Sequence, residues 1–398
     1  MRRSLSHRKR LPMHRLPPPS AWISAFVAAL VGFGGTVALV IRALQALGAT
    51  GPQIGTALTA LCLGIAIGSA VLSIQQRVPV ILAWSTPGAA LLAGVSGVSW
   101  SVAVGAFLFA ALVGIAFSLI PALGRLAAAI PHAIAAAMLA GVLMPFCLNL
   151  FRLGSVDPLL VASLVILFLV ARWRFPVYAL LVVLAAGIAL ALIRGQVGAV
   201  VPGAVFGSLV PAPIAFDAGA LASIGLPLFF VTLVSQNLPG LAVLRGAGYP
   251  ARPTPLLLGA GLASLAAAPF GGHAVNLAAI TAAICTNEEA DPEPRRRWKT
   301  GLLYGGFYLL LAAFAPLLVR QFLALPTTLI AALTGIALLP PLGAAIGSLA
   351  TAPEDRDAAI LTLLVTASGV SIFGLGSALW GIVAGLLALS AARLLKRQ

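Results

Sequence analysis

Charged side chains are scarce in this sequence. Asp, Glu, Lys and Arg together make up 8% of the 398 residues, whereas hydrophobic residues make up 61%. A soluble chain of this length could not hide so much apolar surface, so a soluble globular fold is excluded. The mean hydropathy of +1.09 indicates an all-α polytopic membrane protein.

Acids and cysteines are the rarest reactive groups. The nine Asp and Glu residues all fall in predicted loops or at the ends of predicted spans. Cys62, Cys147 and Cys285 lie in or at the ends of apolar segments without metal-ligand spacing, and we expect them to be small packing residues. No clustered set of catalytic or metal-binding side chains is present. We therefore expect no enzyme, no metal site and no cofactor.

Basic residues are more frequent, and the net charge is +15. They occupy short connecting segments, as is typical of membrane proteins, so nucleic-acid binding is not expected. With both termini cytoplasmic, 20 of the 24 lie inside, which predicts an even number of spans in that orientation. The four outside are Arg42, Arg152, Arg194 and Arg320. Residues 1–20 are predicted to be a disordered basic tail near anionic lipid.

Charges and Pro/Gly clusters divide the chain into fourteen candidate spans, and the second half repeats the first at an offset of about 200 residues. Seven spans per half is an odd number, so the second half must run inverted through the membrane. An inverted repeat is typical of a secondary transporter with its site near the middle of the membrane. The matching segments are 100–120, 122–149, 157–171 and 175–193 with 300–320, 322–348, 357–371 and 374–394.

Two spans are interrupted by residues that break helices. Residues 78–84 are rich in β-branched side chains and predict an extended piece. Ser85-Thr86 followed by Pro87 predicts a helix N-cap with proline at the first helical position, so the break is expected at Thr86. In the second half, residues 269–272 predict the extended piece and His273 begins the helix. Broken membrane helices of this kind usually mark a binding site.

The two half-helices would aim their N-termini at one point. A helix N-terminus carries unpaired N–H groups and roughly half a positive charge, and no Lys or Arg lies deep in any span, so a small carboxylate is a natural ligand. The alternative is that these Gly and Pro residues only kink packed helices. The expected substrate-binding residues are Ser85, Thr86, Pro87, Gly88, Gln236, Asn237, Gly271, Gly272, His273 and Asn276.

Histidines are the titratable side chains left inside predicted spans, at His132 and His273. His273 lies at the second break, and the reference pKa of histidine, about 6.5, lies near neutral pH, so it is the predicted proton-coupling residue. The alternative is that it stays a neutral hydrogen-bond donor while the proton travels on water or on the substrate. For His132 a structural role is an equally good interpretation.

Three strings carry a resemblance to a known family: AWSTPGAALLAG (83–94), SQNLPGLAVLRGAGY (235–249) and PFGGHAVNLAAITAAIC (269–285). They resemble the benzoate/proton symporters of bacterial inner membranes, and the likeness extends from about residue 21 to residue 395. The resemblance implies proton-coupled import of benzoate or a related small aromatic carboxylate across the inner membrane by alternating access. A homodimer is one possible assembly.

That family is similar in fold to the uracil/proton symporters and to the wider nucleobase, ascorbate and sulfate carriers. The similarity implies a core domain (21–121 and 219–321), a gate domain (122–194 and 322–396), and spans 3 and 10 that are each half strand and half helix. Nucleobase carriers place carboxylates in spans 8 and 10, whereas this chain has Gln236 and His273 or Asn276 there. A nucleobase/proton symporter is thus disfavoured, and an uncoupled anion exchanger or channel of the same fold remains an alternative.

Overall fold

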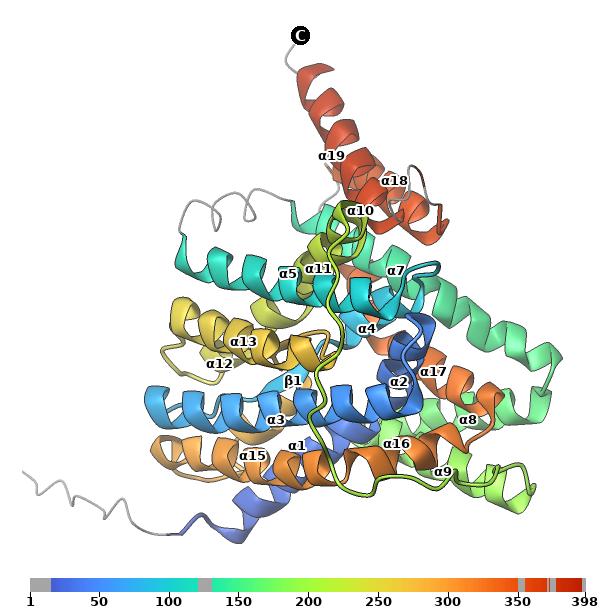
Figure 1. The fold of residues 1–398 in the computed structure, drawn as a ribbon. Coiled ribbons are helices and arrows are strands. Elements are labelled where there is room, and N and C mark those ends of the chain that lie inside the picture. The colour runs from blue at the N-terminus through green and yellow to red at the C-terminus, as the bar shows by residue number, and fades with distance from the viewer. Residues whose placement is uncertain (1–15, 121–130, 350–354, 371, 373–376, 396–398) are drawn as a thin grey trace, which may run out of the picture.

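The computed structural model describes residues 16–120, 131–349, 355–370, 372 and 377–395. Within these ranges the protein is predominantly helical, and two short strands form its one sheet (Figure 1). Seven helical segments are long and apolar enough to cross a membrane, and the pair 294–313 and 315–323, bent by 63°, would be an eighth. The chain is thus a polytopic membrane protein. Most of the predicted basic tail and the domain boundary at 121–122 lie outside the described residues.

The first half of the chain begins with two helices that together make one apolar segment. Its elements are α1 (Pro19–Gly34), α2 (Val37–Ala46), α3 (Gly51–Gln76), β1 (Leu82–Trp84), α4 (Thr86–Ala93), α5 (Trp100–Leu119), α7 (His132–Arg152), η1 (Leu153–Ser155), α8 (Pro158–Arg174) and α9 (Ala179–Ile193). The strand followed by a helix from Thr86 agrees with the break expected at residues 85–87.

The second half also contains one short strand that is followed by a short helix. Its elements are α10 (Ala218–Ala220), η2 (Leu221–Gly225), α11 (Leu226–Thr232), η3 (Leu233–Asn237), α12 (Leu238–Gly246), α13 (Pro253–Ala267), η4 (Ala268–Phe270), β2 (Val275–Leu277), α14 (Ile280–Thr286), η5 (Pro294–Arg296), α15 (Trp298–Ala313), α16 (Ala315–Leu323), α17 (Thr327–Leu349), α18 (Arg356–Ala367) and α19 (Ser377–Leu395).

Two predicted boundaries in the second half are wrong. The polar triplet Ser235-Gln236-Asn237 predicts the end of the eighth span, near 219–237. The helix instead continues to Gly246 through a π-helical turn over Leu233–Asn237, which keeps these polar residues inside the helix. The extended piece was expected at 269–272, but that stretch closes the preceding helix. Gly271 adopts a left-handed conformation (φ +87°) that ends this helix, as glycine commonly does. The extended part is therefore β2, and the helix begins at Ile280 rather than at His273.

The two strands, one from each half of the chain, pair with each other. They are antiparallel, with Ala83 opposite Asn276. Their outer backbone groups are bonded to serine side chains of α3 and α13: Ser69 accepts from the N–H of Leu82, and Ser264 bonds both the N–H and the carbonyl of Val275. Inside a membrane no water is available to bond the edge of a short sheet, so these serine side chains provide the hydrogen-bond partners.

The helices form two packed groups. In one, α5, α13, α3 and α15 run side by side, with α1 against α15 and α2 against α4 (Figure 1). In the other, α7 packs on α17 and α18, α18 on α19, and α8 on α9. We call these the α3 group and the α7 group.

An extended connection over residues 195–217 joins α9 to α10 and crosses the face of the α3 group (Figure 1). Its amides bond backbone carbonyls on that group: Gly207 to Ala313 at 2.7 Å, Ala212 to Pro269 at 2.8 Å, and others.

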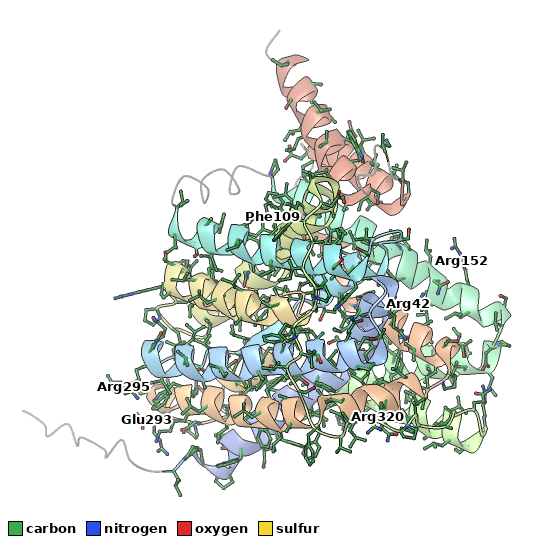
Figure 2. The ribbon with its side chains drawn as sticks, viewed as in Figure 1. Arg42, Phe109, Arg152, Glu293, Arg295 and Arg320 are labelled. Atoms are coloured by element: carbon green, nitrogen blue, oxygen red, sulfur yellow. The ribbon has the colours of Figure 1, made fainter. Side chains whose placement is uncertain are left out.

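Basic residues separate to the two ends of the helices, since Arg42, Arg152 and Arg320 lie at one end and Arg295 at the other (Figure 2).

Adjacent glycines of α15 offer a test of this packing. A Cβ at Gly305 would lie 2.7 Å from the carbonyl oxygen of Ala66 in α3, whereas a Cβ at Gly306 meets no described atom within 4 Å. Overpacking a tight interface costs about 1–3 kcal/mol, so Gly305→Val is expected to lower the thermal unfolding midpoint in detergent well below that of Gly306→Val. Equal midpoints for the two variants would contradict the close approach of α3 and α15.

Candidate functional site

A cavity of about 410 Å³ lies between the two helix groups, at the point where both strand–helix junctions meet. The α3 group, with β1, η3, α12 and α14 that pack on it, contributes residues from α1, the α1–α2 junction, β1, α4, η3, α12 and the start of α14. The α7 group contributes residues from α7, α9 and α17. The wall formed by the α7 group is apolar for most of its extent, and includes Ala136, Leu139, Leu180 and the Pro340–Pro341 pair inside α17. Cavities of this size suit small organic ligands.

The polar groups of the cavity are hydroxyls and an amide. Thr36, Thr86, Ser235, Gln236, Thr281 and Ser348 line it, and no Asp, Glu, Lys, Arg or His does so among the described residues. The hydroxyl oxygens of Ser235 and Thr281 are buried, and neither makes a hydrogen bond of good geometry within the described part of the chain, although the Thr281 hydroxyl lies close to that of Tyr304. A buried polar group without a partner costs about 1–3 kcal/mol, so these two hydroxyls favour a ligand that pairs with them.

The start of α4 forms one wall of the cavity. Ser85 is its N-cap and accepts hydrogen bonds from the Gly88 N–H at 3.0 Å and from the Thr232 hydroxyl at 2.9 Å. Pro87 has no N–H, so Thr86 is the residue of the first turn whose amide is left to donate. The positive end of the α4 dipole therefore faces the cavity without a competing carboxylate.

Removing the cap tests whether it holds this helix start. Ser85→Ala is expected to destabilise the protein by about 0.5–2 kcal/mol, because Gly88 and Thr232 both lose their partner. Ser99→Ala is the matched control, since Ser99 is the N-cap of α5 but makes no capping hydrogen bond. Thermal unfolding of both variants measures the difference, and a Ser99 effect as large as that of Ser85 would contradict the capping role.

The cavity includes only part of the predicted site. Thr86, Pro87 and Gln236 line it as expected. Ser85 lies behind the helix start as its cap, and Gly88 packs against Leu228, whose Cδ1 would lie 2.7 Å from an added Cβ.

The remaining predicted residues are not part of the cavity wall. Gly271 packs against Trp100, and an added Cβ at Gly272 would lie 2.7 Å from that of Ala267, so both glycines serve helix packing. The Asn237 Oδ1 accepts from the Leu277 N–H at 2.9 Å, and the Asn276 Nδ2 donates to the Leu277 carbonyl at 3.0 Å. These side chains hold β2 in place, because the extended piece begins six residues later than the sequence indicated.

His273 also lies away from the cavity. It is 1% exposed, and its Nε2 is 3.1 Å from the backbone carbonyl oxygen of Ser85, so it contacts the α4 cap from behind. Its Nδ1 has no hydrogen-bond partner in the described residues. Any effect of His273 on a ligand in the cavity must therefore pass through Ser85.

Sequence reasoning missed two groups of lining residues. Thr281 stands in the first turn of α14 and would have been singled out if the break had been placed at residue 279. Pro340 and Pro341 were identifiable as a proline pair inside an apolar span, which is a common mark of a functional interruption. Ser235 belongs to the polar triplet before Leu238, but only its two neighbours were expected to bind the ligand.

A second hollow of about 560 Å³ lies between α3 and α13 but lacks such anchors. Gln75 is the one polar side chain among its lining residues, and the remainder are Gly, Pro, Ala and larger apolar residues. The smaller cavity between the helix groups is therefore the better candidate site. Cys62, Cys147 and Cys285 are all buried, in agreement with their expected packing role.

Comparison with known proteins identifies the family. A family model described as "Benzoate membrane transport protein" matches residues 16–391. This chain belongs to that family. It is 38% identical over 373 residues to the inner membrane protein YdcO of Escherichia coli (strain K12), covering 93% of this chain and 95% of that protein. It is 36% identical over 382 residues to the benzoate membrane transport protein of Acinetobacter baylyi, covering 93% and 94%.

Solved transporters share the fold of this benzoate-family chain. The transmembrane domain of the cyanobacterial bicarbonate transporter BicA matches with a TM-score of 0.58 at 14% identity, covering 93% of this chain and 96% of that one. The anion transporter Slc26a9 from mouse matches with a TM-score of 0.61 at 12% identity, covering 94% and 68%. The family confirms that the chain is a membrane transporter and not an enzyme.

Proposed function

We propose that the protein imports benzoate or a related small aromatic carboxylate together with protons, by alternating access. The observation that carries this proposal is the cavity between the helix groups, whose polar wall offers two unpaired buried hydroxyls and the start of α4 and no charged side chain. The carboxylate would bond Ser235, Thr281 and the Thr86 amide, with Gln236 beside it. The aromatic ring would lie on the apolar wall of α7 and α17.

The proposal includes fourteen crossings in a seven-plus-seven inverted repeat. That count follows if the two strand–helix units and the shorter helices α8, α9, α18 and α19 each cross once, in addition to the longer segments. Support comes from the paired strands and from Ser69 and Ser264, which bond them from corresponding helices of the two halves. The α3 group would be the core domain and the α7 group the gate domain.

With both termini cytoplasmic, the present conformation would be open to the cytoplasm. The lining residues from the α7 group come from one end of each helix: Ala136 and Leu139 from the first half of α7, Leu180 from the start of α9, and residues 337–348 from the second half of α17. In the proposed orientation all of these are cytoplasmic halves. Movement of the core domain against the gate domain would then expose the site to the outside.

Two other functions remain to be separated by experiment. A nucleobase carrier would place a carboxylate at the site, and none lines the cavity among the described residues. An uncoupled anion transporter is favoured by the fold that the chain shares with solved anion transporters. For the coupled mechanism we propose His273 as the group that takes up the proton, acting on the site through Ser85.

Uptake into proteoliposomes tests the proposed function. Labelled benzoate is expected to accumulate when the lumen is alkaline relative to the outside, and a protonophore is expected to abolish the accumulation. Exchange of benzoate at equal pH should survive the protonophore. Accumulation of benzoate that persists in the presence of the protonophore would favour the uncoupled anion transporter. Uptake of uracil in preference to benzoate would favour the nucleobase carrier.

A further inference from the structure

The hydrogen bond of His273 fixes which ring nitrogen can take up a proton. A backbone carbonyl only accepts, so the Nε2 that faces the Ser85 oxygen at 3.1 Å must carry a hydrogen. In the neutral ring Nδ1 is then the unprotonated nitrogen. This atom is buried and has no partner among the described residues, so it is available as the proton acceptor.

A small side cavity of about 40 Å³ lies against His273, within the α3 group. It is formed by α5, α11, η3, α13 and the segment before β2, and its polar lining residues are Thr232, Asn237, Ser264 and His273. A polar cavity of this volume has room for a water molecule. It shares with the substrate cavity none of the residues that line either one.

The side cavity extends toward one end of the molecule. Phe117 lies two residues before the end of α5, and Leu257 lies in the second turn of α13, which begins just after Arg252. Under the proposed orientation this is the cytoplasmic end. Apolar Phe117, Phe229 and Leu257 surround the outer part of the cavity, with the helix glycines Gly114 and Gly261 between them.

We propose that His273 exchanges its proton with the cytoplasm through this side cavity, separately from the path of the substrate. This inference rests on the proposed function and gives its coupling step a route. In the import cycle the imidazolium arrives with a proton taken up on Nδ1 from the outside, and it loses this proton to water in the side cavity, which restores the neutral ring. The Nε2–H keeps its bond to Ser85 throughout.

The proton on His273 would act on the substrate site through the α4 cap. The positive charge of the imidazolium lies behind Ser85, and the substrate carboxylate binds in front of it. Protonation therefore raises the affinity for the carboxylate, and the bound carboxylate raises the affinity of His273 for the proton by the same factor. No other charged group competes for this role. The residues that face the side cavity from α5, α11, η3 and α13 include no Asp, Glu, Lys, Arg, Tyr or Cys within the described chain.

Filling the side cavity tests the proposed route. An added Cβ at Gly114 meets only Phe229 Cδ2, at 3.9 Å, so Gly114→Ala fits without strain and Gly114→Val adds bulk inside the cavity. Gly306→Val is the control, because that position faces open space on α15. Two rates are compared in proteoliposomes: benzoate-driven proton entry, recorded by a luminal pH dye, and benzoate exchange at equal pH.

The expected result is a graded loss of proton entry along the Gly114 series, by more than about tenfold for Gly114→Val, with exchange within twofold of wild type. His273→Gln, which keeps a hydrogen-bond donor but cannot titrate, should abolish proton entry and retain part of the exchange. Proton entry at the wild-type rate in Gly114→Val and His273→Gln would overturn the inference. Equal loss of both rates in the well-folded Gly114→Ala variant would overturn the separation of the two paths. Failure of the wild-type protein to transport benzoate would instead reject the proposed function.

Discussion

Replacing Gln236 by Glu is expected to abolish benzoate binding. The side chain lines the cavity beside the hydroxyls of Ser235 and Thr281, so the substitution adds a negative charge where the carboxylate is proposed to bind. Like charges at close range cost several kcal/mol, and each 1.4 kcal/mol is tenfold in affinity, so the Kd should rise by at least about 100-fold at pH 8. Binding of labelled benzoate to the purified protein measures the change.

Gln75→Glu is the control for this experiment. It makes the same chemical change on an exposed side chain near the end of α3, outside the substrate cavity. Its Kd should stay within about twofold of the wild-type value. Benzoate binding that survives Gln236→Glu would place the anion elsewhere.

Removing both unpaired hydroxyls should lower the affinity for benzoate without lowering the stability of the protein. Ser235→Ala with Thr281→Val deletes two groups that have no partner in the substrate-free protein, so the free energy of unfolding should stay the same or rise. Hydrogen bonds to a charged group are worth about 1.5–3 kcal/mol each, so benzoate affinity should fall by roughly 100-fold or more.

Thr334→Val provides the comparison. Thr334 is buried, but its hydroxyl bonds the Ile330 carbonyl within α17, and it does not line the cavity. This variant should leave benzoate affinity unchanged. If the double variant loses stability and keeps its affinity, the two hydroxyls serve the fold and not the ligand.

The first break could be predicted from the sequence because its signals are local. Ser85 and Pro87 fix an N-cap and a first helical turn whatever surrounds them, and the helix does start at Thr86. The second break could not be located in the same way. Pro269 and the two glycines that follow also fit the end of a helix, and pairing with β1 decides that the strand falls at Val275–Leu277.

The candidate site was predicted in part for the same reason. Thr86, Pro87 and Gln236 belong to segments whose positions were close to right, and they line the cavity. The second break lies several residues later than the sequence predicts. For this reason His273 lies behind the α4 cap, and Thr281 lies at the cavity wall. The apolar wall of α7 and α17 depends on how two groups of helices pack, which no local pattern in the sequence encodes.

The position of the bound anion is the central claim, and crystals grown with 4-iodobenzoate would test it most directly. The anomalous signal of iodine marks the ring end of the ligand. We expect one strong peak beside the apolar wall of α7 and α17, with the carboxylate at Thr86, Ser235 and Thr281. A dominant peak in the hollow between α3 and α13, or none between the two helix groups, would contradict the account.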